Sequence, residues 1–301
     1  MSRWVPADIP DQTGRTVLVT GANSGLGFHT TLELARKGAR VLMACRNPAK
    51  AETALAAVRE EVADPAVELV QLDLASLDSV ERAAGDVAGR VPHLDLLVNN
   101  AGIMAVPYGK TADGFEMQFG TNHLGHFALT GRLLPLLAKA SEPRVVTVSS
   151  GAHVIGKMQF DDLAPAEADY QRWRRYGMSK LANLLFTGEL HRRSAGRLLV
   201  TAAHPGYAAT HLQDGQGQAA FQALMTFGNK VLAQSDSQGA WPQLYAATMP
   251  DVLGDSYYGP HFLNLRGHPV PTFRTPAARD RETARQLWDI SEELTKVVYD
   301  F

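Results

Sequence analysis

Short apolar runs alternate along this chain with longer segments in which apolar residues recur every three or four positions. Residues 16–20 form the first run, and residues 24–37 carry a helical pattern that ends at Gly38. Residues 17–19 and 96–98 are apolar at every position, as expected for parallel strands that are covered on both faces. The alternation predicts strands joined by crossover helices, and therefore a doubly wound α/β sheet.

The same pattern locates the remaining elements. Further strands are predicted at residues 40–44, 67–73, 94–99, 144–149, 198–204 and 257–263. Further helices are predicted at residues 49–62, 77–89, 114–139, 170–193, 219–232 and 279–294. No Pro/Gly/Ser-rich linker or internal repeat divides these elements. Residues 1–301 are therefore expected to form a single domain around a mostly parallel sheet.

Composition narrows the class of partner. The 301 residues are 45% hydrophobic and carry a formal net charge of -2, which disfavours nucleic acid as the main partner. Cys45 is the single cysteine, so no internal disulfide can form, and the N-terminus lacks the apolar stretch of a signal peptide. No run approaches the roughly 20 apolar residues that span a bilayer. A cytoplasmic location without membrane insertion is therefore expected.

A glycine-rich turn joins the first predicted strand to the first predicted helix. Its sequence, Thr-Gly-Ala-Asn-Ser-Gly-Leu-Gly, spaces the glycines differently from the usual Gly-x-Gly-x-x-Gly of dinucleotide sites. Backbone N–H groups and the positive end of the helix dipole can face a pyrophosphate at such a turn. The alternative is that the glycines only shape the turn. The candidate cofactor residues here are Gly21, Asn23, Ser24, Gly25, Leu26 and Gly27.

Tyr176 and Lys180 stand four residues apart in a predicted helix, with Ser149 and Ser150 upstream. This spacing brings both side chains to one face, where the Lys180 ammonium can lower the pKa of the Tyr176 phenol. A phenol tuned in this way can exchange protons near neutral pH, which points to hydride-transfer chemistry. The alternative for Tyr176 is a half-buried aromatic residue of the helix. Tyr170 lacks a lysine four residues on and is not expected to be the acid.

The glycine spacing, the run Asn-Asn-Ala-Gly at residues 99–102 and the Tyr176–Lys180 pair occur in the same order in a known family. With these motifs the chain resembles the classical short-chain dehydrogenase/reductase family over essentially its whole length. Residues 44–47, 122–127 and 148–157 are most similar to its retinol dehydrogenase and protochlorophyllide reductase-like branch. The resemblance implies a Rossmann-type three-layer αβα sandwich and an oxidoreductase that acts on alcohols and carbonyls.

The resemblance also implies four catalytic residues. Tyr176 would act as general acid in reduction and general base in oxidation, and Lys180 would also bind the nicotinamide ribose. Ser150 would donate a hydrogen bond to the substrate oxygen. Asn122 would hold a water that links Lys180 to solvent; the alternative is a helix-interior amide bonded to backbone. The insert at residues 158–173 is longer than in the commonest family members, so the pairing of Ser150 with Tyr176 rests on fold analogy.

Cofactor preference depends on the end of the second predicted strand, where an acidic residue would accept hydrogen bonds from the ribose of NAD. The chain has Arg46 there, whose guanidinium can pair with a 2′-phosphate, so NADP is expected in preference to NAD. Alternatively, Arg46 is a solvated loop charge or stacks on adenine. Lys50, one helical turn on, could add charge to this site, but a surface lysine is the favoured interpretation. The resemblance adds Asp73 and Leu74 at the adenine, Asn100, Ala101 and Gly102 after the fourth strand, and Pro205, Gly206 and Thr210 on the nicotinamide side.

Residues 211–232 combine a Gln- and Gly-rich stretch with an apolar helical pattern, which suits a substrate lid beside the nicotinamide loop. Phe221 and Met225 could line an apolar pocket, or equally belong to the core or to a dimer contact. The branch resemblance suggests an apolar substrate such as a retinoid, a steroid or a long-chain aldehyde. A second class of function also fits a dinucleotide site: a sensor that binds the nicotinamide cofactor without turnover.

Two further expectations concern metals and assembly. The histidines are scattered and no cysteine cluster accompanies them, so no metal site is expected. The family resemblance implies a homodimer or homotetramer. Its subunits would pair through exposed apolar faces of the helices at residues 114–139 and 170–193.

Overall fold

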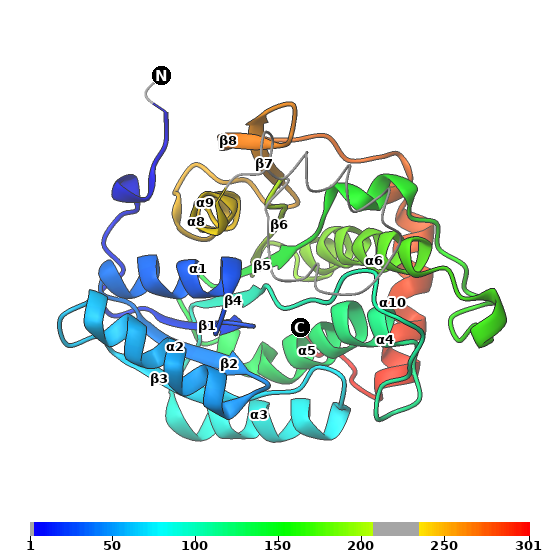
Figure 1. Cartoon of the computed structure of the whole chain (residues 1–301), viewed down its shortest axis with the longest axis horizontal. Helices are drawn as coiled ribbons and strands as arrows, with labels where there is room; N and C mark the ends of the chain where they lie inside the picture. The colour runs from blue at the N-terminus through cyan, green and yellow to red at the C-terminus, as the bar shows by residue number, and fades with distance from the viewer. Residues whose placement is uncertain (1–2, 207–234) are drawn as a thin grey trace.

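The computed structural model of the chain describes residues 3–206 and 235–301 (Figure 1). Within these residues, one sheet of eight strands has the order β3-β2-β1-β4-β5-β6-β7-β8. Neighbouring strands are parallel except for the antiparallel pair β7 and β8. The strands are β1 Thr16–Thr20, β2 Arg40–Cys45, β3 Val67–Gln71, β4 Leu96–Asn99, β5 Arg144–Val148, β6 Leu199–Ala203, β7 Tyr257–Phe262 and β8 Arg266–Pro271.

Helices and short helical turns connect the strands. The helices are α1 Gly25–Arg36, α2 Pro48–Glu61, α3 Leu77–Arg90, α4 Met117–Phe119, α5 Gly125–Leu137, α6 Arg172–Arg193, α8 Asp236–Gly239, α9 Trp241–Thr248 and α10 Arg281–Thr295. The short turns are η1 Pro6–Asp8, η2 Gly120–Leu124, η3 Gly151–Ile155, η4 Glu167–Asp169 and η6 Ala277–Arg279.

Two hydrophobic cores lie on opposite faces of the sheet, because alternate residues of a strand point to opposite sides. On one face, Val17 and Val19 of β1 pack with residues of α1, α2 and α9. On the other face, Leu18 of the same strand packs with residues of α3, α5, α6 and α10. Figure 1 shows α1 and α9 on one side of the strands and α3 and α5 on the other. The doubly wound, mostly parallel fold expected from the sequence is therefore confirmed.

The strand order reverses direction beside β1. The chain runs outward from β1 through β2 to β3, then returns to the other side of β1 with β4 and continues through β5 to β6. In an open parallel sheet, such a reversal leaves a crevice at the carboxyl ends of the central strands, where ligands bind. The chain leaves the sheet at this crevice after Thr20 of β1 and after Asn99 of β4.

The helix predicted at residues 114–139 is not one continuous α-helix. It begins at Met117, passes through the π-helical turn η2, and becomes α5 at Gly125. A side chain at Gly125 would collide with the Leu74 carbonyl, so the helix packs directly on the segment after β3 at this point. π-Helical turns inside helices are frequent at functional sites. This one contains Asn122.

Sequence patterning missed a strand and a helix near the C-terminus. Strand β8 contains two prolines and a glycine, which are rare inside sheets, but an edge strand tolerates them. Helix α9 spans eight residues with a proline in its first turn, which is too short for a clear helical period. The helix predicted at residues 219–232 and the lid predicted at residues 211–232 lie outside the described residues.

Helix α10 and the residues after it cover α5 and α6. Trp288 of α10 stacks on Phe186 of α6 with ring centroids 5.9 Å apart. The Tyr299 hydroxyl donates a 2.6 Å hydrogen bond to the carbonyl of Phe127 in α5, and a side chain at Gly131 would meet the Tyr299 ring. Nearly all of α5 and α6 is therefore buried within one chain. In these two fully described helices, the exposed apolar faces needed for the expected subunit pairing are absent.

Within residues 3–206 and 235–301, no helix combines the length and the apolar character needed to cross a membrane. Helix α6 has 22 residues, but arginines occupy both of its ends.

Candidate active site

The glycine-rich turn lies between β1 and α1 and leaves the N-terminus of α1 open. Gly21 and Gly25 have positive φ values of 66° and 50°, a conformation that favours glycine. A side chain at Gly27 would collide with the Gly21 carbonyl, so this glycine allows the helix to pack closely on the turn. Ser24 occupies the N-cap but makes no capping hydrogen bond through its side chain. N–H groups in the first turn of a helix lack intrahelical partners, so this N-terminus can bind an anion.

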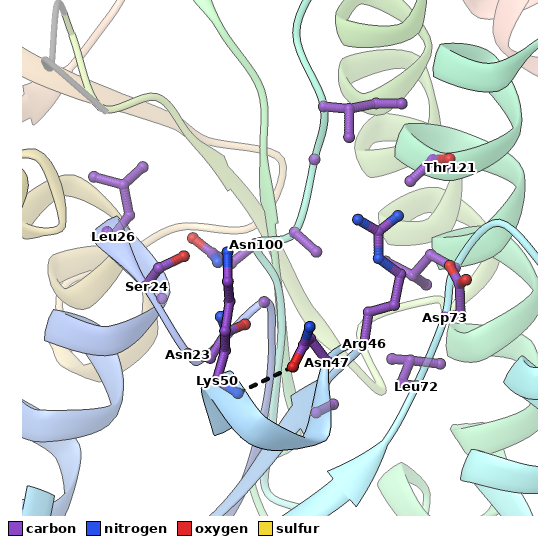
Figure 2. Close-up of a pocket in the computed structure, with 18 residues that line it drawn as sticks. Asn23, Ser24, Leu26, Arg46, Asn47, Lys50, Leu72, Asp73, Asn100 and Thr121 are labelled. Carbon is purple, nitrogen blue, oxygen red and sulfur yellow. Dashed lines mark hydrogen bonds between the residues drawn. The ribbon is translucent and has the colours of Figure 1, made fainter. Parts of the chain in front are cut away.

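A cavity of about 440 Å³ opens at this turn (Figure 2). It is bounded by the glycine turn and by the segments that follow β2, β3 and β4. The predicted cofactor residues that line it are Gly21, Asn23, Ser24, Gly25, Leu26, Gly27, Arg46, Asp73, Leu74, Asn100, Ala101 and Gly102. The lining residues that sequence reasoning did not assign to the cofactor are Ala44, Asn47, Lys50, Leu72, Ile103 and Thr121.

Two basic side chains reach the cavity from the end of β2 and the start of α2. Figure 2 shows Arg46 and Lys50 extending from this corner toward the cavity. Asn47 caps α2 by accepting a 3.0 Å hydrogen bond from the Lys50 N–H, which holds the first turn of this helix in place. Lys50 therefore borders the cavity, and the interpretation of it as an ordinary surface lysine is incomplete.

The segment after β4 is tied to the end of β1. The N–H groups of Asn100 and Ala101 both donate to the Thr20 hydroxyl at 2.9 Å. The Asn100 side-chain amide donates to the Thr20 carbonyl at 2.8 Å, and Gln243 of α9 donates to the Asn100 Oδ1 at 3.2 Å. These bonds fix the start of the segment that leads to Gly102 on the cavity wall.

Helix α6 brings Tyr176 and Lys180 to the side of Gly102. A side chain added at Gly102 would come within 3.2 Å of the Lys180 Nζ. Lys180 donates a 3.1 Å hydrogen bond to the carbonyl of Val148 at the end of β5. Ser150, two residues after Val148, lies near enough to the Tyr176 hydroxyl to lower the pKa of this phenol. The structure therefore brings Ser150 and Tyr176 together despite the long insert between them.

Burial disfavours the charged form of both ionisable groups. Burial raises the pKa of Tyr176 above its ordinary value, and the neighbouring Ser150 side chain opposes this rise in part. Burial also lowers the pKa of Lys180 to about 8. The Lys180 Nζ lies 5.8 Å from the centre of the Tyr176 ring. The net shift of the Tyr176 pKa is therefore upward, opposite to the lowering expected from the ammonium, because desolvation of the phenol dominates.

Asn122 directs its side chain from the π-helical turn to the segment after β4. Its Oδ1 accepts a 2.8 Å hydrogen bond from the Ile103 N–H. Its Nδ2 donates to the Ile103 carbonyl at 2.9 Å and to the Ser179 hydroxyl at 3.0 Å. The side chain is fully buried. The amide is bonded to backbone, but this backbone belongs to a distant segment and not to Asn122's own helix. The role of Asn122 in holding a water beside Lys180 stays a prediction.

The assembled site has counterparts in known proteins. Residues 15–220 match the short chain dehydrogenase family. The chain belongs to the short-chain dehydrogenase family. This short-chain dehydrogenase is 44% identical to retinol dehydrogenase 14 from Homo sapiens over 294 residues, which cover 93% of this chain and 85% of that protein. The family and the retinol dehydrogenase-like branch expected from the motifs are therefore confirmed.

Two solved structures resemble this short-chain dehydrogenase in fold and sequence. An uncharacterized protein from Mycobacterium Paratuberculosis is 46% identical, with a TM-score of 0.83 and coverage of 100% of both chains. A protein from Beutenbergia cavernae, described as an NAD(P)-dependent gluconate 5-dehydrogenase with bound NADP at low occupancy, is 25% identical with a TM-score of 0.62. The match covers 79% of this chain and 91% of that chain. Membership in this family makes the present chain an NAD(P)-dependent oxidoreductase that acts on CH-OH groups.

Two other hydroxyls near the site of this short-chain dehydrogenase have structural partners. Ser149 is buried, and its hydroxyl donates a 2.8 Å hydrogen bond to the Lys180 carbonyl. The Tyr170 hydroxyl accepts from Gln118 at 2.8 Å and donates to the Val106 carbonyl at 3.0 Å. Burial raises the pKa of Tyr170 to about 12. Both hydroxyls are thus engaged in holding backbone segments in place.

The insert before α6 is anchored beside Tyr176 by a buried arginine. Arg175 is 4% exposed and pairs with the carboxylate of Asp162. It also donates a 2.5 Å hydrogen bond to the Asp162 carbonyl. This pair secures the first part of the insert on α6, next to the candidate general acid.

Some residues predicted from the sequence are not brought to the cavity. Pro205 and Gly206 follow β6 and do not line it. Gly206 has a φ of 72°, and a side chain there would collide with the Leu265 carbonyl between β7 and β8. Thr210 lies outside the described residues. In the described part of the chain, no group of three or more His, Cys, Asp or Glu side chains is placed to hold a metal ion.

Proposed function

We propose that this short-chain dehydrogenase is an NADP-dependent oxidoreductase that transfers a hydride between nicotinamide and an apolar alcohol or carbonyl substrate. The proposal rests mainly on the half-buried Ser150 beside the buried Tyr176 and Lys180, the last of which lies against Gly102 on the wall of the cavity. A dinucleotide site beside a phenol and a second hydroxyl donor supplies what reduction of a carbonyl needs.

The residues present fit a dinucleotide cofactor. The open N-terminus of α1, where Ser24 leaves the cap position without a side-chain bond, offers N–H donors to a pyrophosphate. The cavity of about 440 Å³ is lined by Arg46 and by Gly102 as well as by this turn. When bound, NADPH supplies a hydride and NADP accepts one.

Tyr176 acts as the general acid in reduction. Its raised pKa keeps the phenol protonated at neutral pH, so it can donate a proton to the substrate oxygen. Ser150 donates a hydrogen bond to the same oxygen and stabilises the negative charge that develops there. In oxidation the proton moves the other way, from the alcohol to Tyr176.

Lys180 supports Tyr176 from the next turn of α6. With a pKa of about 8 it is mostly protonated at pH 7, and the Val148 carbonyl holds one of its protons. We assign it to bind the nicotinamide ribose. Its charge also stabilises the Tyr176 phenolate that proton transfer leaves behind.

Arg46 and Lys50 support the preference for NADP over NAD. Both line the cavity at the place where an acidic residue would bind the ribose of NAD. Asp73 contributes the carboxylate in the cavity lining, but it follows β3 and accepts a 3.0 Å hydrogen bond from the Ala75 N–H. A 2′-phosphate carries nearly two negative charges and suits the planar fork of a guanidinium. The NADP in the Beutenbergia cavernae protein is consistent with this preference.

An apolar substrate is supported by the relatives and by the residues after Ser150. Retinol dehydrogenase 14 is named for an apolar alcohol. In η3, Val154 and Ile155 are 60% and 57% exposed. Aliphatic side chains beside the reacting hydroxyls favour a retinoid, a steroid or a long-chain aldehyde over a sugar or a charged metabolite.

A panel of substrates tests this proposal. The purified enzyme receives NADPH with retinoid, steroid and aliphatic carbonyls, and the absorbance of the reduced cofactor is followed. Tyr176→Phe should lower turnover by about a hundredfold or more, because it removes the proton donor. Its NADPH affinity should stay within about threefold of wild type, since the ring is retained.

The same assay separates the enzyme from the alternative function. NADPH binding without turnover of any substrate in the wild type would favour a nicotinamide-dinucleotide sensor. Activity of Tyr176→Phe within a fewfold of wild type would show that another group donates the proton.

A further inference from the structure

His126, the second residue of α5, lies buried between the glycine turn and the π-helical turn. Its Nδ1 lies 3.0 Å from the carbonyl oxygen of Asn122, and its Nε2 lies 2.9 Å from the hydroxyl of Thr20. The residue is 1% exposed, so water does not compete for these contacts. Both ring nitrogens therefore bond to segments that build the candidate active site.

The partners determine the tautomer of this ring. A carbonyl oxygen can only accept, so Nδ1 carries the proton and donates it to Asn122. Burial lowers the pKa of His126 to about 4, and the charge of Lys180 acts in the same direction, so the ring is neutral at pH 7. Nε2 is then an acceptor for the proton of the Thr20 hydroxyl. The Val98 carbonyl, at 3.3 Å, is a more distant acceptor for the same proton.

The hydrogen-bonded chain holds the segment after β4 at two places. At its first end, the Thr20 hydroxyl accepts from the N–H groups of residues 100–101, each at 2.9 Å. At its second end, the Asn122 side chain bonds both the N–H and the carbonyl of Ile103. His126 joins these two ends, because one nitrogen bonds Thr20 and the other bonds the Asn122 backbone.

Gly102 lies between the two places that this chain holds. A side chain added at Gly102 would come within 3.2 Å of both the Asn122 Oδ1 and the Lys180 Nζ. Gly102 also lines the cofactor cavity. If residues 100–103 moved relative to η2, the cavity wall would shift against Lys180. The bridge through His126 opposes that movement.

We propose that His126 is a positioning residue for the dehydrogenase reaction: its Nδ1–H tautomer locks the segment after β4 to the π-helical turn and so holds Gly102 against Lys180. The inference rests on the proposed function for its effect on turnover. His126 contacts Thr20 and Asn122 and acts through them, so its effect on the reaction is indirect.

His123, in the π-helical turn just before α5, provides a matched control. It is also 1% exposed, and burial lowers its pKa to about 3. Its Nε2, however, bonds the hydroxyl of Ser291 in α10 at 2.9 Å, so this ring is joined to the C-terminal helix and not to Thr20. Phe at either position keeps an aromatic ring and removes the polar atoms. His126→Phe then loses the hydrogen bonds to Thr20 and Asn122, whereas His123→Phe loses the hydrogen bond to Ser291.

The central experiment compares His126→Phe with His123→Phe in the full-length protein. NADPH affinity is measured by fluorescence titration, kcat with the best carbonyl of the panel, and stability by thermal unfolding. His126→Phe should weaken NADPH binding about tenfold and lower kcat about tenfold or more, whereas His123→Phe should change both by less than about twofold. If the two variants lost equal stability and changed NADPH affinity and kcat equally, the role of His126 would be only structural and the proposal would be overturned.

Two conservative variants separate the two hydrogen bonds of the ring. His126→Asn places an amide nitrogen near the position of Nδ1 and can keep the bond to Asn122, whereas His126→Gln reaches toward Thr20. Each should recover part of the affinity that His126→Phe loses. If neither recovers any, the shape of the ring is responsible and the proposed bridge is wrong.

The tautomer itself can be read from nitrogen-15 spectra of histidine-labelled protein. The signal that disappears in His126→Phe should belong to a neutral ring protonated at Nδ1. A ring protonated at Nε2 would contradict the bridge. These spectra and the NADPH titration need no substrate. A wild type without turnover would therefore refute the proposed function, and the two measurements would still decide whether His126 positions the cofactor segment.

Discussion

At the scale of single residues, Tyr176 and Lys180 form a pair in which burial works against ionisation of both members. The raised pKa of Tyr176 keeps its proton available for reduction. Lys180, with a pKa of about 8, has its titration close to physiological pH. The Lys180 ammonium, which we assign to bind the cofactor ribose, can therefore lose its charge at a mildly alkaline pH.

NADPH affinity should fall as pH rises through about 8. The ammonium of Lys180 is present at pH 7 and is lost above its lowered pKa, and its attraction for the cofactor is lost with it. The dissociation constant should rise by up to about tenfold between pH 8 and about 9.5. Lys180→Arg keeps the charge and should flatten this profile. NADPH affinity is measured by fluorescence titration across this pH range. If it changed with pH in the same way in the wild type and in Lys180→Arg, Lys180 would not control cofactor binding.

Arg46→Asp should reverse the cofactor preference. A charge-assisted contact of Arg46 with the 2′-phosphate is worth about 1.5 to 3 kcal/mol, which corresponds to roughly ten- to a hundredfold in affinity for NADP over NAD. An aspartate would repel the phosphate and accept hydrogen bonds from the ribose of NAD. Steady-state kinetics with both cofactors measure the change. Equal use of NAD and NADP by the wild type would show that Arg46 points into solvent and does not contact the 2′-phosphate.

Residue types and spacing could predict most of the cavity but not its electrostatics. The glycine turn, Arg46 and the run after β4 are local in the sequence, and all line the cavity. The neighbours of Tyr176 that set its pKa come from distant segments, and desolvation depends on how those segments pack. The partners of Asn122 and His126 are likewise nonlocal, so sequence alone left them open.

At the scale of elements, the sheet was predictable because each buried parallel strand is a short apolar run. The π-helical turn was not, since five residues are too few to change the apolar spacing of the helix around them recognisably. What distinguishes this turn is close packing at Gly125 on the segment after β3, which is a tertiary contact. The proline-containing β8 was missed because its position at the sheet edge, and not its residue types, allows it to be a strand.

Acid should destabilise the fold through histidines buried in or beside these elements. Burial lowers the pKa of His123 and His204 to about 3 and of His126 to about 4. In the unfolded state these histidines have ordinary pKa values near 6.5, so below that pH the unfolded state binds more protons than the folded state. The stability that they contribute is fully present above a pH of about 6.5 and is lost as the pH falls toward 4. Each histidine contributes a slope of about 1.4 kcal/mol per pH unit.

Urea unfolding at several pH values between about 7 and 4.5 measures this slope. His123→Phe should remove one proton from the difference between the unfolded and the folded state and reduce the slope by about 1.4 kcal/mol per pH unit, whatever its effect at pH 7. An unchanged slope would mean that the ring is protonated in the folded protein.

At the scale of the whole molecule, the C-terminal helix occupies the place where subunits were expected to meet. The Trp288 and Tyr299 rings pack on the outer sides of α6 and α5. A pairing of two chains through these helices would require α10 to leave them. Sequence periodicity could identify α5 and α6 but not that α10 covers them, because periodicity does not show which apolar faces pack against each other.

Trp288→Ala should cost about 3 to 5 kcal/mol in the free energy of unfolding, because it removes a large ring from the core beneath α10. The loss should also expose Phe127 and Phe186 and promote self-association. Denaturant unfolding and light scattering measure the two effects. Val298→Ala, at a position that is 74% exposed, is the control and should change stability by less than about 0.5 kcal/mol. A cost below about 1 kcal/mol for Trp288→Ala would contradict the packing described.

The cover formed by α10 and the segment after it also has a consequence for synthesis on the ribosome. Because domains assemble as the chain emerges from its N-terminus, α5 and α6 are made well before Trp288 and Tyr299, which complete their core. Until those residues leave the exit tunnel, the nascent chain presents Phe127 and Phe186 without their partners. The folding of this half of the protein is therefore completed only after Trp288 and Tyr299 have emerged, and until then the growing chain is a natural client for chaperones that bind apolar surfaces.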